Sequence, residues 1–315
     1  MARTRSAAKR QRVATAVESA LANIDVVSQL AAFLEAKDLC QVKATCKALG
    51  SANGEAASNG LSMAEEAAKR VYEGALDEEK AALPRHESES WIVLYHHLLM
   101  LQASLTFDQL IGRSVEYRGG DKAAVQGRSA NGVVYNSLTI WRNSSQAICG
   151  NHIMRAGKHW VTFTSSSSFD DFQDVGVVRP LPGWDKGGLD GFSPAMRDLR
   201  VNLQRERTDK WEGDVHYCRL EMGDGDCFWS DWTGRYVEAT DWIGSDDYDT
   251  DCRTLGMLLD LGEGTLSVYQ NGRRLGTLKD GLAGEYCWIA GFWKGKGDVS
   301  IQRGYGLKSS FSSVD

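Results

Sequence analysis

An acidic stretch in the second half of the chain comes nearest to a known chemical motif. Asp247-Tyr248-Asp249-Thr250-Asp251 has the alternating carboxylates that begin a calcium-binding loop. Such a loop also needs a glycine at its sixth position, for a sharp turn, and a glutamate at its twelfth, as the final ligand. These two positions hold Cys252 and Leu258. The pattern therefore predicts no specific calcium site.

Other catalytic and cofactor patterns are incomplete. Cys149 and His152 have the spacing of a metal-ligand pair, but no second pair stands at zinc-finger distance. Gly262-Glu263-Gly264 precedes a strand rather than a helix, so it predicts a hairpin turn and not a phosphate cradle. No nucleophile elbow stands out, although a spatial triad leaves no trace in sequence order. We expect a protein without enzymatic activity, cofactor or metal.

Three loops combine aromatic and acidic residues in a way that is typical of binding sites. They span 180–190, 223–234 and 238–251, and the last holds six carboxylates and no lysine or arginine. Trp and Tyr supply large rigid contact areas, and carboxylates around them select a basic or amide-bearing segment of a substrate protein. The candidate binding residues are Trp184, Asp185, Trp229, Asp231, Trp232, Trp242 and Tyr248.

Two other interpretations of these loops stay open. Tryptophan is buried on average, so these side chains can instead plug the ends of the fold. The acidic loop can also be a solvated surface with no partner. The binding hypothesis predicts that Trp232→Ala weakens partner binding with little change in thermal stability. A large drop in Tm would instead place Trp232 in the core.

The elements that must position these loops are short strands. Runs with strand composition span 159–164, 174–179, 216–220, 255–261, 265–269, 286–293 and 298–302, separated by glycine-rich turns. Asn271-Gly272 is a strong hairpin signal, because both residues tolerate the positive φ of a type I′ turn. The pattern predicts a two-sheet antiparallel β-sandwich that contains a three-stranded meander over 254–278.

Four landmarks of this half resemble the SPRY domain family. They are Gly157-Lys158-His159-Trp160-Val161, Val175-Gly176-Val177, the hairpin around Asn271-Gly272, and Asp298-Val299-Ser300-Ile301, in the family's order. One departure is Thr162, where the family usually has an acidic residue. The resemblance implies a module that binds peptides and proteins and performs no chemistry.

The first third of the chain reads as short helices. Apolar positions over 25–34 form an amphipathic stripe, Asp38 is a possible cap of a second helix, and Ser62 is a possible cap of a third over 62–73. A fourth helix is expected over 89–101, with Trp91, Leu94, Tyr95 and Leu98 on one face. These segments predict a small helical bundle.

The order of residues in this bundle resembles an F-box. Asp25-Val26-Val27-Ser28-Gln29-Leu30, then Phe33-Leu34, Asp38-Leu39 and Cys46-Lys47 follow the family's order, although Ala22-Asn23 replaces its leading Leu-Pro. The resemblance implies docking on a Skp-type adaptor and a cullin scaffold. The docking residues would be Val26, Val27, Leu30, Leu34 and Leu39. The alternative is a helical bundle that only packs against its neighbour.

Composition divides the chain and limits its partners. Nine of the ten tryptophans lie after position 110, which indicates a change of domain. We expect an α + β multidomain protein: a disordered basic tail (1–20), an F-box-like helical domain (21–105), a SPRY-like sandwich (106–306) and a flexible tail (307–315). The net charge of −6 argues against nucleic acid, and no apolar stretch is long enough for a membrane span. Seven scattered cysteines suit an intracellular location, in the cytoplasm or the nucleus.

Together these features predict the substrate-recognition subunit of a cullin-type ubiquitin ligase. A SPRY module with no ligase role is the first alternative. A carbohydrate binder or hydrolase that uses Asp231 and Asp241 is the second.

Overall fold

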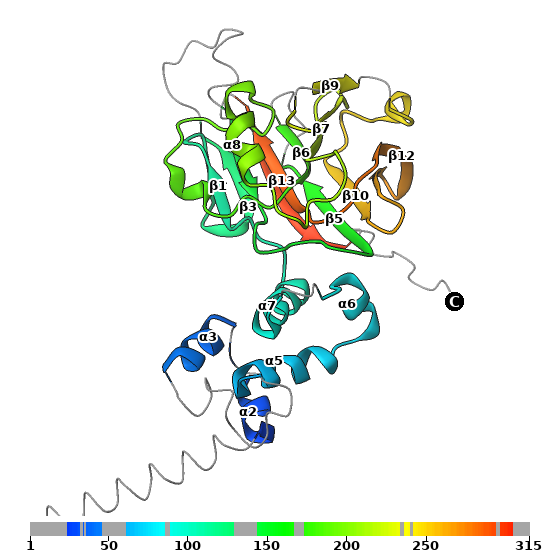
Figure 1. Ribbon diagram of the computed structural model, residues 1–315. Helices are drawn as coiled ribbons and strands as arrows, with labels where there is room; N and C mark the ends of the chain where they lie inside the picture. The colour runs from blue at the N-terminus through cyan, green and yellow to red at the C-terminus, as the bar shows by residue number, and fades with distance from the viewer. Residues whose placement is uncertain are drawn as a thin grey trace, which may run out of the picture. The chain divides into compact units, whose positions relative to one another are not determined.

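The chain forms two compact units, Met1–Ala103 and Ser104–Asp315, which we call the helical unit and the β unit. The computed structural model describes residues 24–31, 34, 36–45, 61–85, 89–128, 144–166, 173–233, 236–239, 242–293 and 297–304 (Figure 1). The terminal segments 1–20 and 307–315, expected to be disordered, lie outside these ranges. The expected domain boundary followed residue 105, close to the division after Ala103.

The helical unit packs around a carboxylate. Its helices are α2 (Ile24–Ala31), α3 (Ala36–Thr45), α5 (Met63–Glu73), α6 (Asp77–Ala82) and α7 (Trp91–Gln102). The buried Glu65 of α5 accepts hydrogen bonds from Lys43 of α3 (2.8 Å) and from the backbone N–H of Ile92 in the first turn of α7 (3.2 Å). A carboxylate at a helix N-terminus is favoured by the helix dipole. Glu65 thus links three of the helices.

The predicted helices are present, with differences at their ends. Ser62 caps α5, since its hydroxyl accepts from the N–H of Glu65 (3.3 Å). Asp38 does not cap α3, which begins two residues earlier, at Ala36, and takes Asp38 into its first turn. The sequence did not predict α6, a short helix that begins after Leu76 with no hydrogen bond from the cap side chain. Whether this bundle is an F-box stays a prediction.

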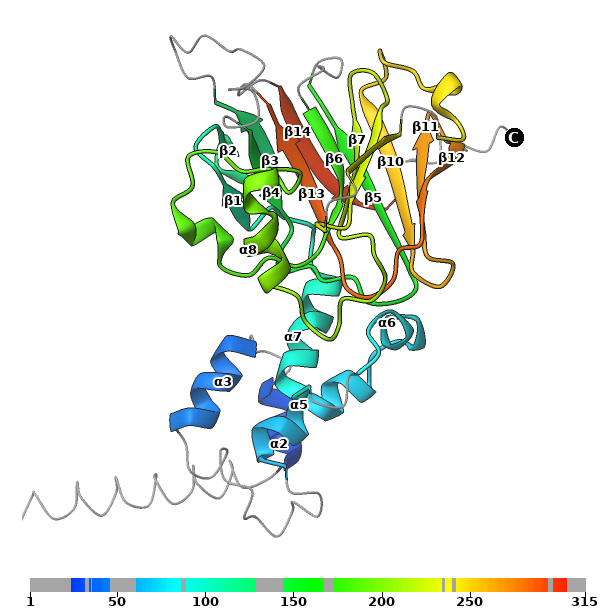
Figure 2. The ribbon, with the colours of Figure 1, turned by 45° about the horizontal axis from the view of Figure 1, so that its top comes forward.

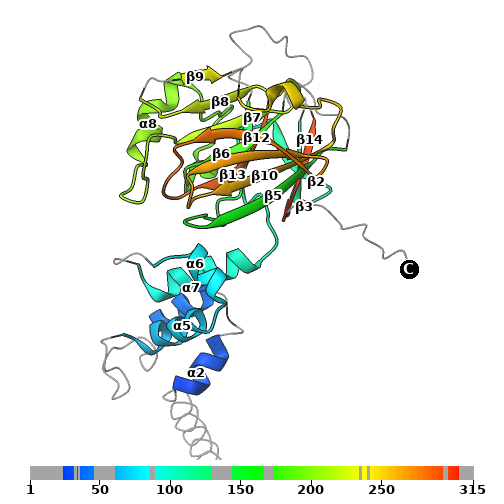
Figure 3. The same cartoon turned by 90° about the vertical axis from the view of Figure 1, so that its right-hand side faces the viewer.

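The β unit is an antiparallel sandwich of two sheets, as predicted (Figure 2). Sheet A has the spatial order β1 (Gln109–Ile111), β4 (Ser145–Ile148), β13 (Cys287–Phe292), β6 (Gln173–Val178), β7 (Tyr217–Glu221), β8 (Cys227–Ser230) and β9 (Tyr236–Ala239). Sheet B has the order β12 (Arg273–Asp280), β11 (Thr265–Gln270), β10 (Thr254–Asp260), β5 (Lys158–Thr164), β14 (Asp298–Arg303), β3 (Asp121–Gly127) and β2 (Val115–Arg118). Figure 3 shows β9, β8 and β7 following one another at one edge of sheet A.

The predicted meander is β10–β11–β12. Leu255 pairs with Gln270 and Asp260 with Thr265, and the chain then turns at Asn271 and Gly272. Their φ angles of 50° and 80° are those that a type I′ turn requires.

The two sheets differ in how their outer faces are covered. Alternate residues of sheet A enter two cores: Val177 and Trp288 face sheet B, whereas Val178 and Ile289 face a second cluster. That second cluster is completed by a segment that contains η2 (Trp184–Gly187), η3 (Arg197–Leu199) and α8 (Arg200–Arg205). The central strands of sheet A are consequently buried on both faces, and β6 and β13 contain only buried residues.

Candidate functional site

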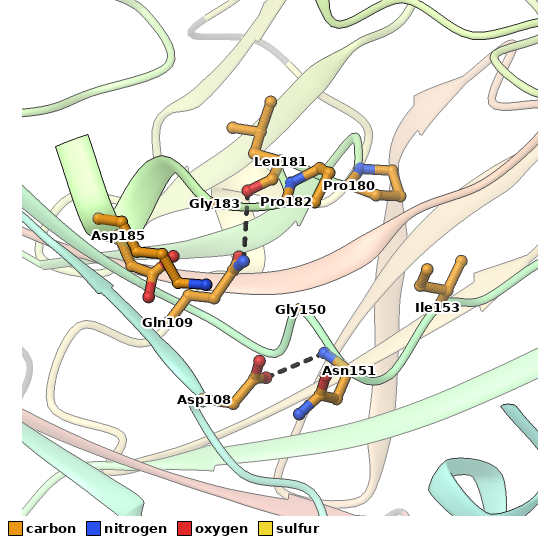
Figure 4. A pocket seen from close by; sticks show the side chains of 11 residues that line it. Asp108, Gln109, Gly150, Asn151, Ile153, Pro180, Leu181, Pro182, Gly183 and Asp185 are labelled. Atoms are coloured by element: carbon orange, nitrogen blue, oxygen red, sulfur yellow. Dashed lines mark hydrogen bonds between the residues drawn. The ribbon is translucent and has the colours of Figure 1, made fainter. Parts of the chain in front are cut away.

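A pocket opens after β6, where the chain enters the segment with η2, η3 and α8, which we call the covering segment because it packs on the outer face of sheet A. Its volume is about 300 Å³. Asp108 and Gln109 come from the start of β1, and Gly150, Asn151 and Ile153 from the turn after β4. The remaining lining residues follow β6: Pro180, Leu181, Pro182, Gly183, Asp185 and Lys186. We call this the acidic pocket (Figure 4).

Local sequence fixes the wall of this pocket after β6. Proline sets its own φ, so Pro180 and Pro182 restrict the chain before the turn. Gly183 adopts a left-handed φ of 82°, which glycine tolerates, and η2 follows at once. The Trp184 ring then packs on buried Phe192, with ring centroids 5.2 Å apart. Asp185 is therefore presented from a turn that is anchored on one side.

Gln109 ties the opposite wall to this turn. Its Nε2 donates to the carbonyl of Leu181 (3.3 Å), and its Oε1 is buried with no hydrogen-bond donor among the described residues. Gly150 provides the space for this amide, because a Cβ there would stand 2.6 Å from Oε1. The Gln109 Oε1 atom, which carries the partial negative charge of the amide, therefore lies beside the pocket as an available acceptor.

Two carboxylates give the pocket its charge. Asp108 accepts a hydrogen bond from the backbone N–H of Asn151 (3.0 Å), and Asp185 is exposed. Burial raises the pKa of Asp108, and the charge of Asp185 raises it further, against the opposing effect of backbone hydrogen bonds. Among the described residues neither carboxylate forms an ion pair, and Lys186 is the single cation of the lining. The pocket therefore favours a positively charged ligand.

The predicted binding residues do not all meet at this pocket. Asp185 lines it, and Trp184 supports it from the turn. Trp229 lies half-buried on β8 with the Lys279 ammonium 4.7 Å from its ring centroid. Asp231 is 8% exposed and binds the N–H and hydroxyl of Thr233, so it closes its own turn.

Trp232 is part of the second core, and its prediction as a contact residue is wrong. It is 1% exposed, and its indole N–H donates to the carbonyl of Pro194 (2.9 Å). Its ring also lies against Trp211 and His216. A buried indole with a satisfied N–H has no group left for a partner.

Trp242 is 6% exposed, which corrects its prediction as a contact residue, whereas Tyr248 is half-buried and its role as a contact residue stays a prediction. The Trp242 indole donates to the carbonyl of Gly225, and the Tyr248 hydroxyl donates to that of Met222, both at 2.8 Å. The large apolar side chain between them that reaches solvent is Ile243, 81% exposed. No sequence pattern favours Ile243 over the larger aromatic residues as a contact residue.

The predicted docking residues of the helical unit divide in a similar way. Val27 and Leu39 are 3% and 2% exposed and belong to the core of the helical unit, so neither presents a docking surface. Leu34 is half-buried against that core, and the side chain of Leu30 lies outside the described residues. Val26 is 36% exposed. Of the apolar α2 side chains that the structure describes, Val27 is directed inward and Val26 outward.

Sequence reasoning missed Asp108, Gln109 and Asn151. They follow ordinary strand and turn patterns, and they meet the turn at 180–186 only through the pairing of β1 with β4 and the fold of the covering segment. A lone Asp-Gln pair at the start of a strand carries no local signal of this contact.

Metal chemistry finds no support in the described part of the chain, which contains no group of three or more His, Cys, Asp or Glu able to hold a metal ion. In the calcium-like stretch, Asp247 pairs with Arg273 (2.5 Å) and Asp249 accepts from the N–H of Asp251 (3.0 Å). Asp241, named for a hydrolase, lies outside the described residues. No helix in the described ranges is long and apolar enough to cross a membrane.

Solved structures similar to this chain include two SPRY domains. The SPRY domain of human HERC1 is 10% identical and covers 62% of this chain and 96% of its own. The TRIM65 PSpry domain is 18% identical, with 66% and 94% covered, and stonustoxin is 14% identical, with 70% and 30% covered. All three have a TM-score of 0.37. No protein-family model and no curated protein matches the sequence.

Proposed function

We propose that this chain is a protein-interaction adaptor whose β unit binds a basic segment of a partner protein in the acidic pocket. The observation that carries this proposal is the pair of carboxylates, Asp108 and Asp185, in a walled hollow without an ion-pair partner among the described residues. A cation brought by a partner would relieve the repulsion between them. The rigid sandwich beneath keeps the site formed before binding, which lowers the entropic cost of association.

The finer proposal is that the adaptor serves a cullin-type ubiquitin ligase. The support for it is the F-box-like residue order of the helical unit, together with the SPRY-like landmarks of the β unit. In that role the chain supplies proximity rather than chemistry, because it raises the effective concentration of a substrate lysine near a conjugating enzyme. A protein-binding module with no ligase role is the alternative.

Peptide display tests the binding role. A library of random dodecamer peptides is selected on the full chain and on the Asp108→Asn/Asp185→Asn variant. We expect peptides rich in Arg or Lys to be enriched on the wild-type chain and lost on the variant. Equal selection of the same peptides by both proteins would exclude the acidic pocket as the binding site.

Size-exclusion chromatography with a purified Skp adaptor tests the ligase role. We expect co-elution with the wild-type chain, and its loss in Val26→Arg, which places a charge at the exposed docking position of α2. Val93→Arg is the matched control, because Val93 is a similarly exposed apolar residue, at 43%, on α7. An absence of co-elution with the wild-type chain would favour the module without a ligase role.

A further inference from the structure

The walls of the acidic pocket differ from one side to the other. Figure 4 shows Asp185, Gln109 and Asp108 gathered on the side away from Ile153 and Pro180. A ligand that fills this space meets acceptors at one end and apolar surface along its length. A basic side chain has this shape, with a charged head and a methylene stem that packs on apolar surface.

The number and spread of acceptors distinguish the two basic side chains. Lysine presents a compact, strongly hydrated charge, whereas arginine presents a planar fork of five N–H donors that is more weakly hydrated. The acidic pocket offers carboxylates from two separate elements, the start of β1 and η2. A guanidinium, with donors on several nitrogen atoms, suits two separate acceptors better than the compact ammonium group of lysine. Asp108 is partly buried, so a cation that binds it must lose part of its hydration shell. This desolvation costs less for the weakly hydrated guanidinium than for the ammonium group.

The rim contains a cation of its own, which sets the net charge. Lys186 follows Asp185 directly and lines the same pocket, so the three ionised groups sum to one negative charge. A monovalent cation therefore neutralises the pocket, and a second one would be in excess. Proline rings at 180 and 182 add flat apolar surface for the stem of the ligand.

We propose that the acidic pocket recognises a single arginine side chain of the partner protein, with its guanidinium between Asp108 and Asp185 and its stem along Pro180, Pro182 and Ile153. This inference rests on the proposed protein-binding function and names the residue that the site selects. Charge-assisted hydrogen bonds from a guanidinium to carboxylates are stronger than neutral ones, and their geometry adds specificity.

The test uses small amides rather than an unidentified protein. N-acetyl-arginine methylamide, its lysine counterpart and its citrulline counterpart are titrated into the 15N-labelled full chain, and backbone amide shifts of Asn151, Gly183 and Asp185 are followed. Citrulline keeps the shape of arginine and lacks its charge. We expect saturable shifts with arginine at a Kd of about 1 mM, as suits one side chain. We expect weaker binding with lysine and none with citrulline.

Two variants and a control assign the effect to the pocket. Asp108→Asn keeps an acceptor for the Asn151 N–H and removes the charge, and Asp185→Asn removes the second charge. Each should weaken arginine binding by about tenfold or more, the usual cost of losing a charged hydrogen-bond partner. Asp198→Asn, an exposed carboxylate on η3 outside the pocket, should leave binding unchanged.

The outcomes separate this inference from the function on which it rests. Equal shifts with citrulline and arginine, or tighter binding of lysine, would overturn the arginine assignment. If selected peptides bind through Asp108 and Asp185 but the arginine amide causes no shift, the inference fails and the protein-binding function stands. If the arginine amide binds and no peptide is selected, the arginine site stands and the protein-binding function fails.

Discussion

Two aromatic loops of the β unit, both expected to contact a partner, are built in opposite ways. The turn at 180–186 supports Asp185 on the half-buried ring of Trp184 and leaves a pocket open beside it. The loop at 242–251 turns Trp242 and Tyr248 inward, where each donates a hydrogen bond to a backbone carbonyl. Aromatic and acidic composition alone does not separate the two. What marks the loop at 242–251 as inward is that the Trp242 indole N–H and the Tyr248 hydroxyl donate to backbone carbonyls.

The inward loop is also fixed by close backbone packing. Gly276 of β12 lies against the carbonyl of Ile243, and a Cβ at Gly276 would stand 1.6 Å from that oxygen. Gln270 closes the other end through a pair of hydrogen bonds with the backbone of Asp249. These contacts make the loop at 242–251 part of the scaffold.

The largest effect expected from this contrast is on stability at Trp232. Trp232→Ala should cost about 3–5 kcal/mol of unfolding free energy, because it empties a fully buried site and leaves the Pro194 carbonyl unpaired. Trp184→Ala, at a half-buried ring, should cost about 1 kcal/mol. Urea denaturation of both variants measures the difference. Similar losses would contradict the division into inward and outward loops.

The second effect concerns the backbone contact at Gly276. Gly276→Ala should cost about 1–3 kcal/mol, since the new methyl group displaces the carbonyl of Ile243. Gly188→Ala is the control for glycine loss without a clash, because its Cβ would meet nothing within 4 Å, although its positive φ adds strain. Thermal denaturation compares the stability of the two variants. A smaller loss of stability for Gly276→Ala than for Gly188→Ala would show that the loop at 242–251 shifts at little energetic cost.

The third effect is a pH dependence of the second core. Burial first, and then the charges of Arg179 and Arg207, lower the pKa of His216 to about 4, against the opposing charge of Asp231. The unfolded chain, with an ordinary histidine pKa near 6.5, then binds more protons than the folded chain between these values. Stability should therefore fall as the pH falls from 6.5 towards 4.

Denaturation midpoints at pH 7.5, 6 and 5 measure this slope. His216→Gln keeps an acceptor for the Nε–H of Arg179 and removes the titrating group, so its slope should be shallower. An unchanged slope would show that His216 does not contribute. His159, whose pKa burial also lowers to about 4, would then be the group to vary next.

The smallest effect on stability should come from the acidic pocket itself. Asp185→Asn should change the free energy of unfolding by less than about 0.5 kcal/mol, because the side chain is exposed and has no ion-pair partner within the described ranges. The same change should weaken peptide binding. A destabilisation comparable with that of Trp184→Ala would mean that Asp185 holds the turn.

The sandwich could be predicted because its signals are local. Period-two patterns place β5, β10 and β11 within one or two residues of their bounds, and Asn271-Gly272 fixes a hairpin through φ angles alone. The direction of Trp232 could not be predicted in this way. It follows from a positive φ of 55° and from a hydrogen bond to Pro194, 38 residues away in the sequence.

The acidic pocket shows the same limit. Asp185 was identified because it lies next to Trp184 in a proline- and glycine-containing loop. Its counterpart Asp108 comes from another element and is brought near by strand pairing and by the hydrogen bond between Gln109 and Leu181. When a site is made by long-range contacts, a sequence pattern can indicate the residues of one segment but not their counterparts from another.

Matched removal of two charges, from the acidic pocket or from the loop at 242–251, tests the account most directly. The affinity of one display-selected peptide is measured for the wild-type chain, for Asp108→Asn/Asp185→Asn and for Asp246→Asn/Asp251→Asn, whose carboxylates are exposed on the inward loop. We predict a loss of at least about thirtyfold for the first pair, and less than about twofold for the second. The reverse order would place the partner on the loop at 242–251 and contradict the assignment of the acidic pocket.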